Sequence, residues 1–115
     1  MIRRGDIWWA DLTQSLGSET RQPVLVVSSD AFNRSQIPTV VAVGVTSDLR
    51  LAVAPGNVEL TQSDSSLPAT SVVNVSQILT VRKNDLDSWM ATVTADLLRR
   101  VEAGLRLVLE LRAPG

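Results

Sequence analysis

Two residue types that carry much of protein chemistry are absent from this sequence, which has no cysteine and no histidine. Without cysteine, neither a disulfide nor a thiolate metal site can form. Without histidine, the commonest general base at neutral pH and the commonest metal ligand are both missing. Histidine-dependent triads and zinc hydrolases are therefore excluded, and catalysis would need carboxylates, hydroxyls, arginine or backbone amides. We expect neither a metal nor a cofactor.

Long apolar segments are also missing. No stretch approaches the roughly 18 to 20 consecutive apolar residues of a membrane span. Residues 1–6 carry arginines and an aspartate where a signal peptide has an apolar core. The 115 residues suit one domain, and a hydrophobic content of 44% is enough for a core. We therefore expect one cytoplasmic domain over residues 1–115, with no membrane association.

The charges are nearly balanced, with 11 basic residues, 12 acidic residues and a formal net charge of −1. Lys83 is the only lysine, so ten of the basic residues are arginine. Nucleic-acid binding needs a local cluster of cations and not a positive total. The planar fork of arginine suits phosphate groups, but a GC-rich coding sequence would produce the same bias. Composition alone leaves RNA binding open.

The central feature of the chain is the change from polar to apolar residues within residues 17–29, Gly-Ser-Glu-Thr-Arg-Gln-Pro-Val-Leu-Val-Val-Ser-Ser. Residues 24–27 are all apolar and mostly β-branched, which predicts a strand buried on both faces. Pro23 lacks an N–H group, so we expect it to open that strand. The preceding loop holds Glu19 and Arg21. A polar loop on a buried strand can aim reactive groups, although two solvated charges are the commoner outcome.

The rest of the chain predicts an α+β fold. Apolar runs or alternation predict further strands at residues 5–12, 39–46, 56–60 and 71–81. Apolar residues then recur at helical spacing from an N-cap at Thr94 to about residue 111, with residues 113–115 ending the helix. Strands followed by one amphipathic helix describe an α+β domain. The short strands favour a strongly bent antiparallel sheet or small barrel, with the helix covering one side.

The burial of the three tryptophans and of one polar loop can be predicted from the sequence. Trp8 and Trp9 are adjacent, so they must face opposite sides of a strand, and the apolar residues that alternate with Trp8 favour a buried or semi-buried place for it. Trp89 is expected to pack inward. Residues 63–66, Ser-Asp-Ser-Ser, read as too polar to bury and as part of a mobile loop.

Five stretches match, in order and approximate spacing, the pattern of one family. They are residues 4–12 (RGDIWWADL), 17–19 (GSE), 23–28 (PVLVVS), 45–47 (VTS) and 71–78 (SVVNVSQI). The set covers nearly the whole chain and resembles the MazF/PemK toxins of bacterial toxin–antitoxin systems. The resemblance implies a small SH3-like barrel with a C-terminal helix, a homodimer and an antitoxin partner. It also implies sequence-selective, metal-independent cleavage of single-stranded RNA.

The resemblance also implies site residues, with one departure. The family's catalytic arginine lies immediately before the strand-opening proline, where this chain has Gln22, with Arg21 one residue earlier. A remodelled loop would let Arg21 reach the same point. The catalytic threonine corresponds to Thr46, and Glu19 matches an acidic position implicated in some members. The residues expected to bind RNA are Gln22, Ser47, Asn74, Gln77 and Trp8.

The expected reaction needs no external nucleophile, because the 2′-hydroxyl of RNA can attack the adjacent phosphorus. The products are a 2′,3′-cyclic phosphate and a 5′-hydroxyl end. Arg21 and Thr46 would stabilise charge on the phosphoryl oxygens, and Glu19 is the nearest candidate base. Two alternatives stay open. One is a non-enzymatic toxin of the same fold that inhibits a protein target such as a topoisomerase, and the other is a barrel that serves only as a binding module.

Overall fold

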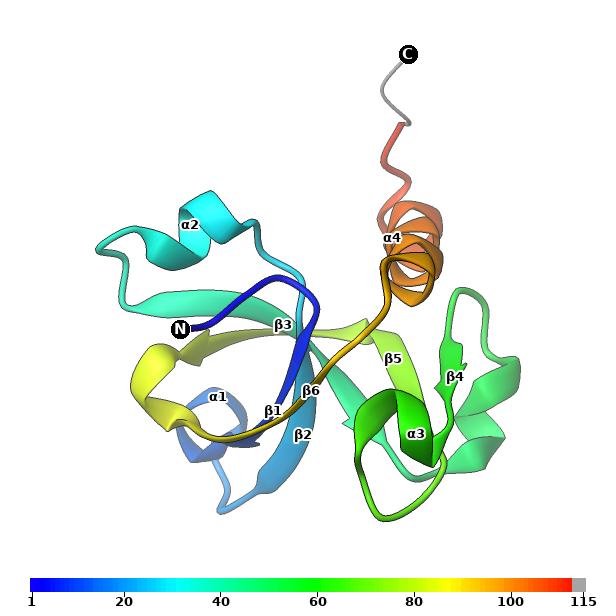
Figure 1. The fold of residues 1–115 in the computed structure, drawn as a ribbon, viewed down its shortest axis with the longest axis horizontal. Coiled ribbons are helices and arrows are strands. Elements are labelled where there is room, and N and C mark those ends of the chain that lie inside the picture. Colours follow the sequence, from blue (N-terminus) through cyan, green and yellow to red (C-terminus); the bar gives the residue numbers. More distant parts are fainter. Residues whose placement is uncertain (113–115) are drawn as a thin grey trace.

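The alternating apolar segments form a curved sheet, which is seen in a computed structural model that describes residues 1–112 (Figure 1). The strands are β1 (Asp6–Asp11), β2 (Arg21–Val26), β3 (Thr39–Thr46), β4 (Val58–Leu60), β5 (Ser71–Arg82) and β6 (Leu86–Thr92). The helices are α1 (Thr13–Leu16), α2 (Asp30–Arg34), α3 (Gln62–Ser65) and α4 (Ala95–Leu109), with 3-10 turns η1 (Leu49–Val53) and η2 (Lys83–Asp85). The expected helix-ending residues 113–115 lie outside the described range.

All six strands form one antiparallel sheet in the order β4-β5-β3-β2-β1-β6. The pairing of β3 with β5 contains a bulge, because Val43 pairs with Ile78 while the next residue, Gly44, pairs with Asn74. Bulges bend a strand and increase its twist, so this one helps the sheet to curl. The α+β class and the strongly bent antiparallel sheet with a C-terminal helix, implied as an SH3-like barrel, are confirmed.

The centre of the sheet is buried on both faces. One apolar cluster, which includes Leu25, lies between the sheet and α4, and a second, which includes Val24 and Val26, covers the other face. These three residues of β2 are 0% exposed, which confirms the prediction of a strand buried on both sides. Full burial of each such side chain contributes about 1.5–3 kcal/mol. The centre of β2 is therefore a rigid support for whatever its polar end carries.

The polar end of β2 begins earlier than expected. The strand starts at Arg21, so the prediction that Pro23 opens it is wrong. Pro23 pairs with Trp9 of β1, whereas pairs between β2 and β3 begin only at Val24. At Pro23 the strand has a paired neighbour on one side only, which is where a residue without an N–H group is tolerated. Arg21 is thereby part of a strand and not of a loop.

Two further local expectations are wrong, namely that residues 63–66 are all too polar to bury and that Trp89 packs inward. Within residues 63–66, Ser65 is 0% exposed. Its hydroxyl donates to the carbonyl of Thr61 (3.2 Å) and accepts from the N–H of Leu67 (3.1 Å), so its burial leaves no polar atom unpaired. Trp89 is 55% exposed instead of packed inward. It lies on β6, an edge strand of the sheet, where one side of the strand has no neighbour.

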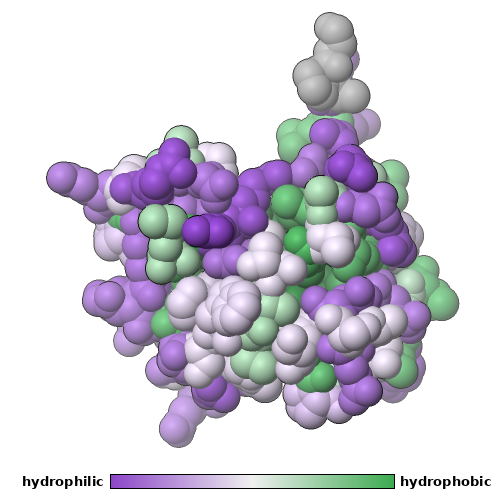
Figure 2. Space-filling view, in the orientation of Figure 1, coloured by the Kyte–Doolittle hydropathy of each residue, from purple (hydrophilic) through white to green (hydrophobic). Residues whose placement is uncertain are grey.

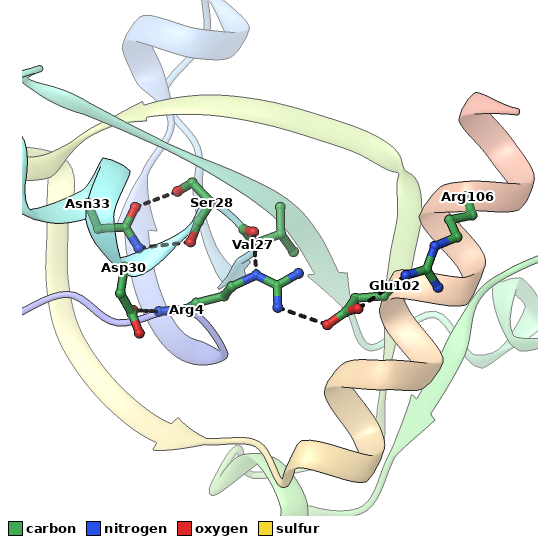
Figure 3. A network of polar contacts seen from close by, with 7 residues as sticks. All are labelled: Arg4, Val27, Ser28, Asp30, Asn33, Glu102 and Arg106. Carbon is green, nitrogen blue, oxygen red and sulfur yellow. Dashed lines mark hydrogen bonds and ion pairs between the residues drawn. The ribbon is translucent and has the colours of Figure 1, made fainter. Parts of the chain in front are cut away.

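Arg4 ties the start of the chain to α2 and α4 (Figure 3). Its backbone N–H donates to Asp30 (2.8 Å), its Nε donates to the carbonyl of Val27 (3.0 Å), and its Nη1 contacts Glu102 of α4 (2.8 Å). Glu102 also pairs with Arg106 at 3.6 Å. The charged groups therefore hold α4 across one end of the sheet. None of the helices within residues 1–112 has the length and apolar character needed to cross a membrane.

Candidate functional site

The end of β3 opens onto a cavity of about 250 Å³. Most of its lining is apolar, and it includes Trp9, Pro23, Leu67 and Pro68 beside the predicted site residues Thr46 and Ser47. The cavity joins β1, β2, β3 and the segment that precedes β5. Of the two adjacent tryptophans, Trp9 lines this cavity, while the other faces away from it. The lining therefore combines apolar side chains with the hydroxyls of Thr46 and Ser47.

A backbone hydrogen bond fixes the position of the Thr46 hydroxyl oxygen. Oγ1 of Thr46 accepts a hydrogen bond from the backbone N–H of Asp48 at 3.1 Å. Within residues 1–112 the hydroxyl donates no hydrogen bond, so its hydrogen is available to a bound group. The turn after Thr46 is fixed by Asp48, whose carboxylate accepts from Nε and Nη2 of Arg50, each at 2.9 Å. Those hydrogen bonds hold the pKa of Asp48 below its ordinary value.

Arg21 does not line the cavity beside Thr46. Its Nε and Nη2 donate to the two carboxylate oxygens of Asp87 at 3.0 and 2.7 Å, and its guanidinium lies 4.6 Å from the ring centroid of Trp9. The hydrogen bonds from Arg21 lower the pKa of Asp87, and those to Asp87 raise the pKa of Arg21. Trp9 thus lines the Thr46 cavity and also contacts the Arg21 guanidinium with its ring. The two predicted catalytic residues therefore lie beside the same tryptophan.

Glu19 lies in a second cavity, of about 370 Å³, whose lining is polar: Asp11, Glu19, Thr20, Arg21 and Asp87. The structure therefore brings Glu19 together with Arg21 but not with Thr46. Despite these carboxylates, no group of three acidic side chains within residues 1–112 is arranged to hold a metal ion. Sequence reasoning missed Asp87, because nothing near it in the sequence marks it; only the pairing of β6 with β1 brings it to Arg21.

Gln22 and Gln77 form a reciprocal amide pair over Gly44. Nε2 of Gln22 donates to Oε1 of Gln77 (3.0 Å) and to the carbonyl of Val45 (3.2 Å), while Nε2 of Gln77 donates to Oε1 of Gln22 (3.2 Å). The Val45 carbonyl can only accept, which fixes the orientation of both amides. Both N–H groups of Gln22 are thus used. Gln77 keeps one N–H that donates to nothing within residues 1–112.

The other two predicted RNA-binding residues, Asn74 and Trp8, do not line the Thr46 cavity. Oδ1 of Asn74 accepts from the hydroxyl of Ser76 (2.9 Å) and from the amide of Asn57 (3.4 Å). Trp8 lines a separate cavity of about 350 Å³, and its Nε1 donates to the buried carboxylate of Asp6 at 3.3 Å. Trp8 also packs against the second apolar cluster, as its expected semi-buried place requires.

Comparison with known proteins identifies the family. The sequence model of the PemK-like, MazF-like toxins of type II toxin–antitoxin systems matches residues 3–109. Endoribonuclease MazF2 of Mycobacterium bovis and endoribonuclease MazF6 of Mycobacterium tuberculosis are each 46% identical to this chain over 113 residues. Each match covers 96% of this chain and 99% of the relative.

Solved structures agree in fold. A mycobacterial endoribonuclease in complex with its cognate antitoxin is 31% identical, with a TM-score of 0.81 that covers 99% of this chain and 100% of the other. MazF of Deinococcus radiodurans is 25% identical, with a TM-score of 0.77 over 96% of this chain and 97% of the other. Given the match over residues 3–109 and the shared fold, the chain belongs to the PemK-like, MazF-like toxins of type II toxin–antitoxin systems.

Proposed function

We propose that this chain is an endoribonuclease toxin that cuts single-stranded RNA at selected sequences without a metal ion. The 2′-hydroxyl of the substrate attacks the adjacent phosphorus, so that a P–O2′ bond forms as the P–O5′ bond breaks. The departing 5′-oxygen takes a proton from water, and the products are a 2′,3′-cyclic phosphate and a 5′-hydroxyl end. The observation that carries the proposal is the available hydroxyl of Thr46 beside an apolar cavity whose Trp9 wall also holds Arg21. The relatives that are 46% identical and named endoribonucleases support the enzyme class.

The catalytic roles follow from donors and acceptors. Negative charge collects on the phosphoryl oxygens in the transition state, so Arg21 acts by charge and by its N–H groups, and Thr46 donates one hydrogen bond. Arginine stays protonated, which excludes it as the base. Glu19, in the same cavity as Arg21, takes the proton of the 2′-hydroxyl. Loss of one such donor typically raises the barrier by about 3–4 kcal/mol, a factor of roughly 100 to 1,000.

RNA recognition uses unstacked bases, which bind on aromatic faces and present their edges to polar groups. The apolar cavity with Trp9 is suited to one base next to the cut phosphate. The neutral side chains near the end of β3 are proposed to contact base edges, and they are Gln22, Ser47, Asn74 and Gln77. Gln77 supplies its remaining N–H for this purpose. Trp8, on the other face of β1, is proposed to contact a nucleotide of the RNA that lies farther from the cut phosphate.

The partners are proposed to be a second copy of this chain and an antitoxin. Exposed apolar side chains occur on η1 and the last turns of α4, where Val53 is 90% and Leu107 is 61% exposed. Figure 2 shows apolar residues gathered toward the α4 side, while the α1 and α2 side is mostly hydrophilic. This surface suits a homodimer. An apolar, acidic antitoxin segment would cover the Thr46 cavity and block RNA, and the toxin would act on RNA in the cytoplasm.

The first test is cleavage of a long, sequence-diverse RNA in EDTA, with the new 5′ ends mapped. We expect discrete cuts with 5′-hydroxyl ends, and we expect Thr46→Ala and Arg21→Ala each to reduce cutting by about 100- to 1,000-fold. Matched controls are Thr80→Ala and Arg99→Ala, which alter exposed residues away from the cavities. Cuts lost only in Thr46→Ala would remove Arg21 from the site. An intact, folded protein that makes no cuts would favour the non-enzymatic toxin.

The second test separates the 2′-hydroxyl mechanism from hydrolysis by water. A short RNA that contains one mapped cut site is compared with the same oligonucleotide made with a single deoxyribose before the cut phosphate. We expect the deoxy substitution to abolish cutting, because it removes the nucleophile. Equal cutting of both oligonucleotides would refute the mechanism while leaving the nuclease activity in place.

The third test concerns the dimer. Equilibrium sedimentation at micromolar protomer concentration is expected to give a mass of two chains. Leu107→Asp, which places a charge on the exposed apolar part of α4, is expected to shift the protein toward the monomer. A wild-type protein that sediments only as a monomer would refute the homodimer.

A further inference from the structure

The ion pair between Arg21 and Asp87 spans three strands of the sheet. Arg21 is the first residue of β2, and Asp87 lies on the edge strand β6. Trp9 of β1 lies between them, since it pairs with Pro23 on one side and with Ser88 on the other. The Arg21 side chain therefore crosses the ring of Trp9, at 4.6 Å from its centroid, to reach the carboxylate. The carboxylate of Asp87 and the ring of Trp9 together fix the position of the Arg21 guanidinium.

The contact leaves one edge of the guanidinium unused. Arginine has five N–H donors arranged in a planar fork. Asp87 takes the Nε–H and one Nη2–H, at 3.0 and 2.7 Å, in a bidentate contact. The other three N–H groups include both on Nη1, and they donate to nothing else within residues 1–112. A second anion can thus bind the Nη1–Nη2 edge without displacing Asp87.

We propose that Asp87 is a positioning residue, which holds the Arg21 guanidinium over the Trp9 ring so that its free edge is presented to a phosphoryl oxygen. The inference rests on the proposed function, in which Arg21 stabilises the cut phosphate. A side chain that is half exposed, as that of Arg21 is at 51%, otherwise samples many rotamers. Fixing it before the substrate arrives avoids that loss of freedom during binding and reaction.

The carboxylate also has an opposing effect, because its negative charge repels RNA. That repulsion acts between exposed groups, with Asp87 itself 40% exposed, and water and salt screen it. Water and salt do not change where Asp87 holds the guanidinium. A displacement of about 1 Å in a reacting group can reduce the rate about 100-fold. Positioning therefore outweighs repulsion, and removal of Asp87 lowers the activity instead of raising it.

The test measures kcat and KM for one short RNA substrate in EDTA, using Asp87→Ala, Asp87→Asn, Arg21→Ala and the double variant. We expect Asp87→Ala to lower kcat by about 10- to 100-fold with KM changed much less. Asp87→Asn keeps an oxygen that accepts from Arg21 and should fall between Asp87→Ala and the wild type. In the Arg21→Ala background, Asp87→Ala should have no further effect. The control Asp96→Asn removes the same charge from an exposed site on α4 and should leave activity unchanged.

The outcomes separate this inference from the proposed function. If the wild type cuts RNA and Arg21→Ala does not, but Asp87→Ala cuts as well as or faster than the wild type, the positioning role is wrong and the nuclease stands. An equal loss from Asp87→Ala with and without Arg21 would overturn it in the same way, because the effect would not pass through Arg21. A wild type that cuts no RNA would overturn the proposed function itself. Thermal unfolding of each variant is measured alongside, and an unchanged midpoint separates a loss of activity from a loss of folded protein.

Discussion

Gly104 of α4 faces the turn before β4, and the substitution Gly104→Ala tests how closely helix and turn approach. A Cβ at this position would lie 2.1 Å from the carbonyl oxygen and 2.9 Å from the carbonyl carbon of Gly56. Both contacts are with backbone, so no side chain can rotate away. Gly56 itself has a φ of +84°, which ties that turn to glycine. Helix α4 would have to move by about 1 Å or more to restore ordinary contact distances, which are above about 3 Å.

The predicted sign is opposite to that of helix propensity. In an exposed helix, replacing glycine by alanine stabilises by about 1 kcal/mol. Overpacking in a tight interior destabilises by about 1–3 kcal/mol, and a clash between two backbone segments belongs at the upper end. We therefore expect Gly104→Ala to lower the free energy of unfolding by about 2 kcal/mol, after the propensity gain has been subtracted.

The assay is urea unfolding at one fixed protomer concentration, because self-association would make the stability depend on concentration. The matched control is Ala103→Gly, at the neighbouring exposed position of α4. It should lose about 1 kcal/mol through propensity alone. If Gly104→Ala were more stable than the wild type, the close approach of α4 to Gly56 would be refuted, and with it the placement of the helix on the sheet.

Two further predictions concern the candidate site. Gly44→Ala would place a Cβ 1.8 Å from Oε1 of Gln77, so we expect it to break the pair with Gln22, alter the mapped RNA cut sites and lower stability by less than about 1 kcal/mol; unchanged cut sites would contradict a role for this pair in recognition. Because Arg21 lowers the pKa of Asp87 in the folded state, the pair's contribution is present above the ordinary carboxyl pKa of about 3.9 and is lost as the pH falls through the lower folded value. Denaturation measured from pH 7 to pH 2 should therefore show a smaller acid-induced loss in Asp87→Asn than in the wild type, and an identical loss would contradict the pairing.

Local patterns in the sequence were enough to predict most of the secondary structure. The apolar run ending at Thr46 predicted β3 with its bounds, and the capping residue Thr94, whose hydroxyl accepts from the N–H of Leu97 at 3.2 Å, marked the start of α4. Both signals depend on residues within one element. The burial of Ser65 and the exposure of Trp89 were predicted wrongly, because each depends on what lies beside the element and not on its own polarity.

For the candidate site too, the sequence identified some of the residues, whereas their contacts depend on the fold. Glu19, Arg21 and Thr46 were identified from their places in the sequence and from the family resemblance, and the cavities in which they lie depend on the fold. Arg21 and Asp87 are 66 residues apart in the sequence, and their contact exists because β1 pairs with β2 on one side and with β6 on the other.

Strands β1 to β5, the cap of α4 and the family pattern were thus determined by the sequence itself, since side-chain periodicity and local hydrogen bonds act over a few residues, whereas β6 was not predicted. Only the tertiary structure decided which partners the polar groups find. The bulge between β3 and β5 lets the amide of Gln77 cover Gly44, and the order of the strands places Trp9 on β1, beneath the guanidinium that reaches from β2 to the carboxylate on β6. Such contacts depend on strand register, and the pairing of distant segments sets that register through burial of both faces of the sheet.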